Sequence, residues 1–330
     1  MNTPDDQSAG LNRPDSVREI ILDQVERLLA AHPGLKGVEA GEWPAALWEA
    51  LEGLGLPLLL VPESLGGIGL GWADAVAVWQ VVGRHGAPAP VGECMLANAL
   101  LAAAGIEPRP GFTSFGPVAP FGRFAAQILM EDGALHAPGV VTPGTNIARE
   151  PRDHVCPGAK LAAGSSNQRG LRLGTALLRA ALMAGAAQHA LDLAVDWANT
   201  RKQFGRALGK FQAIQQQLAL VASEVAAMAV AAAAAGRAVD AHGLEGATFE
   251  IGCAKIIAGE GAHTTASITH QVFAAIGITE DHELHHTTRR LWSWRDEGGS
   301  ERAWAAEIGR NALARGGANL WPDITARDIS

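Results

Sequence analysis

Apolar residues recur at helical spacing through the first hundred positions of the chain. Between Pro14 and His32 they fall three or four positions apart, and Asp15 or Ser16 offers an N-cap. The same spacing predicts further helices over residues 43–51, 72–83 and 91–104. We therefore assign residues 1–107 to an N-terminal helical domain.

The pattern changes between Pro108 and Gly170, where Pro and Gly are frequent and helical spacing is lost. Short apolar runs at 125–130 and 139–142 predict strands. Residues 108–170 are accordingly expected to form a small β segment between two helical parts.

Helical spacing returns after Gly174 and continues almost to the C-terminus. It predicts four long helices over residues 177–197, 211–241, 249–276 and 284–314. Four amphipathic helices bury their apolar faces best against one another, so residues 171–330 are expected to form a four-helix bundle. The predicted fold class is mostly α.

Composition limits the partners of the chain. It has 330 residues, 48% of them hydrophobic, and a net charge of −8. No basic run is longer than two residues, which argues against a nucleic-acid surface and favours small molecules. Three scattered cysteines indicate reduced thiols. The polar N-terminus and the short apolar run 225–235 predict neither a signal peptide nor a membrane span, hence a cytoplasmic protein.

A basic segment joins the first two predicted bundle helices. Gly205 and Gly209 interrupt the helical pattern, and four cations surround them, namely Arg201, Lys202, Arg206 and Lys210. Cationic donors at a turn suit a pyrophosphate. A solvated basic turn is the alternative interpretation of the same residues.

This segment closely resembles a motif of the acyl-CoA dehydrogenases. The motif R-x-x-F-G, followed by F-Q, is met by residues 201–205 and 211–212. In that family the Arg and Gln reach across a subunit interface to the FAD of the neighbour. The resemblance therefore implies FAD as the cofactor, with contacts from Arg201, Gln203, Phe204 and Gln212.

Two further segments extend the resemblance. Residues 62–70 are similar to the family loop P-E-x-x-G-G-x-G-L, and this glycine-rich run lacks the G-x-G-x-x-G spacing, so a tight connection is expected. Residues 271–277 are similar to the segment Q-x-x-G-G-x-G, which adds Gln271 and Gly277 as cofactor contacts. Ala274 and Ala275 replace its two middle glycines, where a methyl group would crowd a close approach to the cofactor.

Residues 295–301 resemble the family loop E-G-T-S-E, which implies Glu297 as the catalytic base. The base removes an α-proton from an acyl-CoA thioester while a hydride passes to the flavin. Such a base is effective if burial raises its pKa, and the N–H of Gly298 would bind the thioester oxygen. A solvated residue in a charged turn is the alternative for Glu297.

A competing motif is the literal H-E-x-x-H formed by residues 282–286. On a helix, His282 and His286 would share one face and could bind zinc beside Glu283. The resemblance places a loop and a helix start here, and no third ligand follows. Exposed or packed histidines are therefore the preferred interpretation, and no metal is expected.

The middle segment lacks the family elements that hold the flavin ring. Residues 112–170 are shorter than in the family and contain no Trp. The family residues that this chain retains are those that contact a partner's FAD. The resemblance therefore implies that the chain is the small subunit of a heteromeric enzyme with a full-length partner. It also implies an electron-transfer flavoprotein as the electron acceptor. Glu297 would then be vestigial. A self-sufficient homodimer or homotetramer, a flavin monooxygenase and a non-catalytic scaffold remain alternatives.

Overall fold

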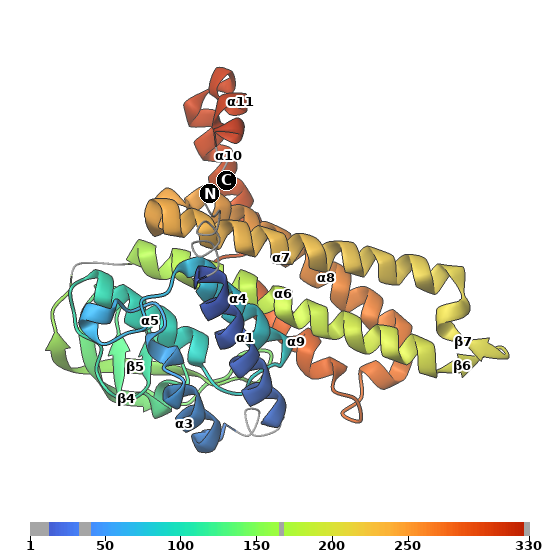
Figure 1. Cartoon of the computed structure of the whole chain (residues 1–330), viewed down its shortest axis with the longest axis horizontal. Coiled ribbons are helices and arrows are strands. Elements are labelled where there is room, and N and C mark those ends of the chain that lie inside the picture. The colour runs from blue at the N-terminus through green and yellow to red at the C-terminus, as the bar shows by residue number, and fades with distance from the viewer. Residues whose placement is uncertain (1–12, 33–40, 165–167, 327–330) are drawn as a thin grey trace, which may run out of the picture.

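The computed structural model describes residues 13–32, 41–164 and 168–326. Along the chain, a group of helices is followed by a small sheet and then by a bundle of long helices (Figure 1). The predicted fold class, mostly α with a short β middle part, is confirmed.

The N-terminal part consists of α1 (Arg13–Ala31), α3 (Ala45–Gly53), α4 (Trp72–Arg84) and α5 (Val91–Ala103). The connection before α4 is tight, as expected. A Cβ atom on Gly67 would lie 2.0 Å from the carbonyl oxygen of Val61, so only glycine fits there. Asp240 of the bundle accepts hydrogen bonds from the first two backbone N–H groups of α4, which joins the two helical parts.

The middle part is a five-stranded sheet in the order β1-β3-β4-β5-β2. Its strands are β1 (Thr113–Phe115), β2 (Val118–Pro120), β3 (Gln127–Leu129), β4 (Leu135–Thr142) and β5 (Arg152–Ala162). β1 and β3 pair in parallel, and the other pairs are antiparallel. The predicted strands at 125–130 and 139–142 overlap β3 and β4, whereas β1, β2 and β5 were not predicted.

The C-terminal bundle contains α6 (Gln168–Thr200), α7 (Gln212–Gly246), α8 (Thr248–Phe273) and α9 (Leu284–Asp296). α6 is central and packs against α4, α5, α7, α8 and α9. Glycines allow α4 and α6 to approach closely, because a Cβ atom on Gly83 would meet the Leu182 carbonyl oxygen at 2.1 Å. A two-stranded hairpin, β6 (Lys202–Gln203) and β7 (Arg206–Ala207), connects α6 to α7.

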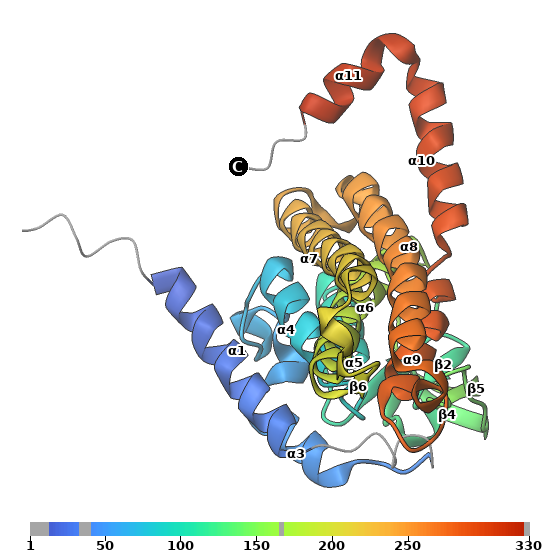
Figure 2. The same ribbon diagram turned by 90° about the vertical axis from the view of Figure 1, so that its right-hand side faces the viewer.

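The single helix predicted over 284–314 is wrong. Gly298 and Gly299 adopt φ values of 75° and 102°, which divide the segment into α9 and α10 (Glu301–Arg315). α10 packs against α8 around the buried Trp304 and then leads away from the bundle, and the following α11 (Gly317–Thr325) folds back toward α7 (Figure 2).

The apolar stretch of α7 is longer than the run 225–235, from which we predicted that no membrane span is present. By length and composition alone, α7 could cross a membrane. Its buried residues recur at helical spacing, and the helix packs against α4, α6 and α8. A single helix of this kind, packed in a bundle, is weak evidence for a membrane span.

Candidate functional site

Glu297, the predicted base, lies directly after α9 and is held by two arginines. Its Oε1 and Oε2 atoms accept hydrogen bonds from Arg152 at 3.0 and 3.1 Å. The Nε atom of Arg179 on α6 lies 2.6 Å from Glu297 Oε2. Asn146 donates a further hydrogen bond at 3.2 Å. All the contacts to this carboxylate are thus of the kind that stabilise its ionised form.

The ion pairs continue away from Glu297 in two directions. Arg179 also pairs with Glu93 on α5 at 2.8 Å. Arg152 pairs with Glu150 at 3.1 Å, and Glu150 accepts a hydrogen bond from Arg290 of α9 at 3.1 Å. Together these contacts tie α5, α6, α9 and the start of β5 to one another.

We call this set the arginine–glutamate network. It consists of three carboxylates and three guanidinium groups, those of Glu93, Glu150, Glu297, Arg152, Arg179 and Arg290. The five residues other than Glu297 are each less than 9% exposed. The side chain of Glu297 is 22% exposed. Because the charges are equal in number and paired, the network can be buried, whereas burial of an isolated charge would be strongly unfavourable.

The pKa of Glu297 moves in the direction opposite to the one that base catalysis needs. Burial alone would raise this pKa, but Arg152 and Arg179 outweigh burial and lower it to about 2. The condition given above for an effective base, a pKa raised by burial, is therefore not met by Glu297 in this structure. A carboxylate of such low pKa is a weak base toward an α-proton.

Little space remains beside the network. The cavity bordered by Glu93, Glu150, Arg179 and Trp294 has a volume of about 20 Å³, whereas ligand pockets typically span roughly 300 to 1,000 Å³. Gly298 packs closely, since an added Cβ atom would lie 2.7 Å from the Ala176 backbone nitrogen. Among the described cavities, the one that borders the network is thus far smaller than a ligand pocket, and Glu297 does not line it.

The predicted cofactor contacts lie at the other end of α6. Arg201, Gln203 and Phe204 are exposed on the β6–β7 hairpin, and Gln212 is the first residue of α7. Within the described part of the chain, no ion pair involves Arg201, and its guanidinium carbon lies 5.9 Å from the centre of the Trp197 ring. Phe204 is 90% exposed at a φ of 51°, a backbone conformation that non-glycine residues rarely adopt.

The segment 271–277 lies at this same end of the bundle. Phe273, at the end of α8, stacks on Trp197 of α6 with ring centres 5.0 Å apart. Gln271 is exposed, whereas Gly277 is buried, where an added Cβ atom would lie 2.7 Å from Cβ of Phe273. The structure therefore brings the hairpin contacts together with Gln271 and Gly277.

Ala274 retains a glycine-like backbone. Its φ of 54° and ψ of −140° suit the glycine that the resemblance led us to expect at this position. The residue is exposed, so its backbone is open to a ligand. The exposed cations of the hairpin and this turn fit the phosphate and adenine side of a dinucleotide.

The two groups of predicted site residues are far apart. Thr200, which precedes Arg201, lies 21 positions after Arg179 on α6, and a helix of that length spans about 30 Å. The hairpin of this chain therefore cannot bind the phosphates of a flavin whose ring lies beside its own Glu297.

The first residues of the H-E-x-x-H motif lie outside the helix on which a zinc site would need them, because α9 begins at Leu284. His282 lies in a bend before α9, where its backbone oxygen contacts the His285 ring at 2.7 Å. No group of three His, Cys, Asp or Glu residues among those described could hold a metal ion. The preference for packed histidines agrees with the 4.4 Å separation of the His282 and Phe273 rings.

Sequence reasoning missed the other charged members of the arginine–glutamate network. Glu93 and Arg179 each stand as a single charge inside an otherwise apolar stretch of a buried helix. Such isolated charges need a buried partner, so their presence was a usable signal. Arg152 gave no comparable signal, because it lies in a polar segment.

Two family models match the chain. Residues 14–107 match the N-terminal domain of acyl-CoA dehydrogenase, and residues 173–315 match the C-terminal domain. Acyl-CoA dehydrogenase IpdE2 of Mycobacterium tuberculosis is 30% identical over 297 residues, covering 82% of this chain and 90% of that protein. Glutaryl-CoA dehydrogenase of Desulfococcus multivorans is 33% identical over 152 residues, 46% of this chain and 36% of that protein.

Solved structures share the fold. A variant of the Tcur3481-Tcur3483 steroid ACAD has a TM-score of 0.81 at 23% identity, covering 92% of this chain and 99% of that chain. The ChsE4-ChsE5 complex from Mycobacterium tuberculosis has a TM-score of 0.79 at 22% identity, covering 90% and 97%. At these identities the likeness concerns the fold alone.

Proposed function

Because the chain belongs to the acyl-CoA dehydrogenase family of flavin-dependent oxidoreductases, we propose that it is the small subunit of a heteromeric acyl-CoA dehydrogenase. In this proposal a full-length partner subunit holds the flavin ring and the acyl-CoA. The present chain contributes contacts to the phosphate and adenine half of the partner's FAD.

The observation that carries the proposal is the pairing of Glu297 with Arg152 and Arg179. A carboxylate held by two arginines, with its pKa lowered to about 2, is a poor base for an α-proton. The distance along α6 between Arg179 and the hairpin implies only that the hairpin binds a flavin held by another chain. That chain could equally be a second copy in a homodimer. If the other chain were a second copy, its own Glu297 would be paired with the same two arginines. This supports a different subunit as the one that holds the substrate.

The hairpin residues would bind FAD by charge and by stacking. Arg201, without an acidic partner among the described residues, would donate to the pyrophosphate. Phe204 would cover the cofactor with an aromatic face that is exposed in this chain. Gln212 and Gln271 would donate or accept hydrogen bonds at the edge of the same site. Bound FAD supplies the hydride acceptor that no side chain provides.

Glu297 would serve this chain as a structural anion. The base that removes the α-proton would then come from the partner subunit. In the self-sufficient alternative, Glu297 would be the base and would have to lose both arginines before substrate bound. An electron-transfer flavoprotein as acceptor and a cytoplasmic location remain predictions under either version.

The test is flavin stoichiometry. The chain is co-expressed with a full-length homologue encoded beside it, and the purified complex is analysed for flavin and for each polypeptide. We expect about one flavin per two chains, because the small subunit supplies only half a site. One flavin per chain, or a flavin-loaded and active preparation of this chain alone, would contradict the proposal.

A further inference from the structure

A cleft lies where the N-terminal helices meet the sheet. Its volume is about 460 Å³, and small-molecule sites typically span roughly 300 to 1,000 Å³. Its walls come from the end of α3, the short helix η1 (Leu56–Leu58), α5 and the linker that leads from α5 to β1. We call it the linker cleft, and it is lined by Glu52, Gly55, Pro57, Leu58, Asn98 and residues 108–111.

Asn98 of α5 brings an unsatisfied oxygen to this cleft. The residue is 1% exposed, and its Nδ2 atom donates to the Pro57 carbonyl oxygen at 3.0 Å. That contact fixes the orientation of the amide, because a flipped amide would place its oxygen against the Pro57 oxygen. The Oδ1 atom is buried and accepts no hydrogen bond from the described part of the chain. A buried acceptor of this kind is unfavourable until a donor reaches it.

Two opposite charges line the same cleft. Burial raises the pKa of the Cys94 thiol to about 12, and the nearby Glu52 carboxylate adds to this effect. Because Asn98 donates to the Cys94 sulfur at 3.5 Å, Glu52 lies in the neighbourhood of Asn98 as well. Arg109 donates to the Leu161 carbonyl oxygen at 3.2 Å. Neither Glu52 nor Arg109 forms an ion pair with any described residue.

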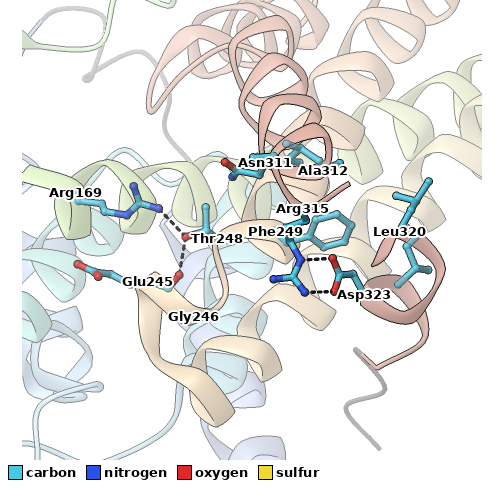
Figure 3. Close-up of a pocket in the computed structure, with 13 residues that line it drawn as sticks. Arg169, Glu245, Gly246, Thr248, Phe249, Asn311, Ala312, Arg315, Leu320 and Asp323 are labelled. Carbon is cyan, nitrogen blue, oxygen red and sulfur yellow. Dashed lines mark hydrogen bonds and ion pairs between the residues drawn. The ribbon is translucent and has the colours of Figure 1, made fainter. Parts of the chain in front are cut away.

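A second cleft of similar volume, about 440 Å³, differs in this respect. It lies between α11 and the corner that joins α7 to α8 (Figure 3). There the guanidinium group of Arg315 pairs with both carboxylate oxygens of Asp323. That cleft therefore pairs two of its opposite charges with each other, whereas the charges of the linker cleft stay available to a ligand.

We propose that the linker cleft binds a small zwitterion, an α-amino acid with an apolar side chain. Its ammonium group would donate to Oδ1 of Asn98 and to the Glu52 carboxylate. Its carboxylate would accept hydrogen bonds from Arg109, and its side chain would lie against Pro57 and Leu58. A zwitterion satisfies the unpaired acceptor and both unpaired charges at once, which a simple cation or anion does not.

This site is separate from the arginine–glutamate network and from the hairpin. Asn98 lies five positions after Glu93 on α5, which places it about 140° further around the helix. It therefore faces η1, whereas Glu93 pairs with Arg179 of α6. A ligand in the linker cleft would thus leave the proposed flavin contacts unchanged.

Isothermal titration calorimetry of the full chain with three probes that share one carbon chain separates the two charges. L-Norleucine carries both charges, 1-aminopentane carries only the ammonium group and hexanoate carries only the carboxylate. We expect norleucine to bind with a Kd of about 1 mM or below. Each singly charged probe should bind at least about 10-fold more weakly, because it loses one charge-assisted hydrogen bond.

Substitutions in the cleft test the same contacts. Glu52→Gln and Arg109→Gln alter exposed side chains, so both variants should fold. Each should raise the Kd for norleucine roughly 10- to 150-fold, and Asn98→Leu should also weaken binding, with circular dichroism to check its fold. Glu107→Gln is the matched control, because Glu107 is exposed on the same linker but does not line the linker cleft.

Three results would overturn the proposal. The first is the absence of binding heat with norleucine at about 10 mM, a concentration that detects even a weak site. The second is norleucine binding by Glu52→Gln and Arg109→Gln that equals binding by the control. The third is equal affinity for norleucine and 1-aminopentane, which would show a site for a simple cation instead.

Discussion

Glu297 and Arg179 form an ion pair in which Oε2 of the carboxylate lies 2.6 Å from Nε of the guanidinium group. Arg179 is 1% exposed and also pairs with Glu93. One arginine on the central helix thus holds both α5 and the loop after α9. Removing either charge leaves a buried partner without compensation, so the pair governs stability as well as the protonation of Glu297.

Glu297→Gln should destabilise the fold. The substitution keeps the size of the side chain but leaves Arg152 and Arg179 with only Glu93 and Glu150 as counter-charges. Breaking a buried ion pair from one side costs about 3 to 5 kcal/mol. Urea unfolding would measure the loss, with Glu280→Gln as the control, because Glu280 is 83% exposed. An equal, small effect of both substitutions would show that Glu297 is not part of a stabilising network.

Acid should weaken the fold in a definite window. The pKa of Glu297 is about 2 in the folded chain, against its ordinary value of 4.5. Its contribution, on the order of 3 kcal/mol, is complete above pH 4.5 and is lost as the pH falls toward 2. Glu297→Gln should therefore flatten the dependence of unfolding free energy on pH in that range. A Glu297→Gln curve that runs parallel to the wild-type curve would contradict the assigned shift.

The same substitution should spare catalysis in the complex. If the partner supplies the base, Glu297→Gln lowers the yield of folded complex but leaves kcat per bound flavin unchanged. Steady-state assays with acyl-CoA and an artificial electron acceptor, normalised to flavin, would measure this. A fall in kcat of about a hundredfold or more, of the order expected on losing a general base, would instead identify Glu297 as catalytic.

Arg201→Ala should release flavin from the complex. A hydrogen bond to a charged group contributes about 1.5 to 3 kcal/mol, so FAD should bind roughly 10- to 150-fold more weakly. Arg237→Ala is the control, since Arg237 is also an exposed arginine of the bundle but lies on α7, well away from the hairpin. The visible absorbance of the complex after dilution and filtration reports bound flavin. Full retention of FAD by Arg201→Ala would remove the proposed role of the hairpin.

The helices could be predicted because burial on one face imposes a period on the sequence. β5 could not, since Arg152–Ala162 contains Pro157 and Gly158 and its buried first residues, Arg152 and Asp153, are charged. The break between α9 and α10 did leave a signal in the sequence. No apolar residue lies between Trp294 and Ala303, and Gly298 and Gly299 stand inside this gap, where their backbone forms the turn.

In the candidate site, too, the features set by local sequence could be predicted and those set by long-range contacts could not. The hairpin and the segment at Gln271 were recognisable because each is a short contiguous motif. The environment of Glu297 was not, because Arg152 and Arg179 are 145 and 118 positions away in sequence. A pKa depends on such neighbours, and no local pattern near residue 297 indicates them.

Ala274→Gly should stabilise the chain and improve its fit to flavin. Ala274 has a φ of 54°, where an L side chain is strained and glycine is not. Relief of that strain should increase the unfolding free energy by about 1 kcal/mol. The exposed turn would also lose the methyl group that crowds a close approach, so the complex should bind FAD more tightly.

The neighbouring Ala275 provides the control for this prediction, because it is exposed as well but does not have a positive φ. Ala275→Gly only adds freedom to the unfolded chain and should cost about 0.5 to 1 kcal/mol. Thermal unfolding of both variants, together with flavin titration of the complexes, compares the two positions directly. If Ala274→Gly destabilises the chain as much as Ala275→Gly does, the backbone at Ala274 is not strained. The glycine-like conformation of Ala274 would then be no evidence for a cofactor site.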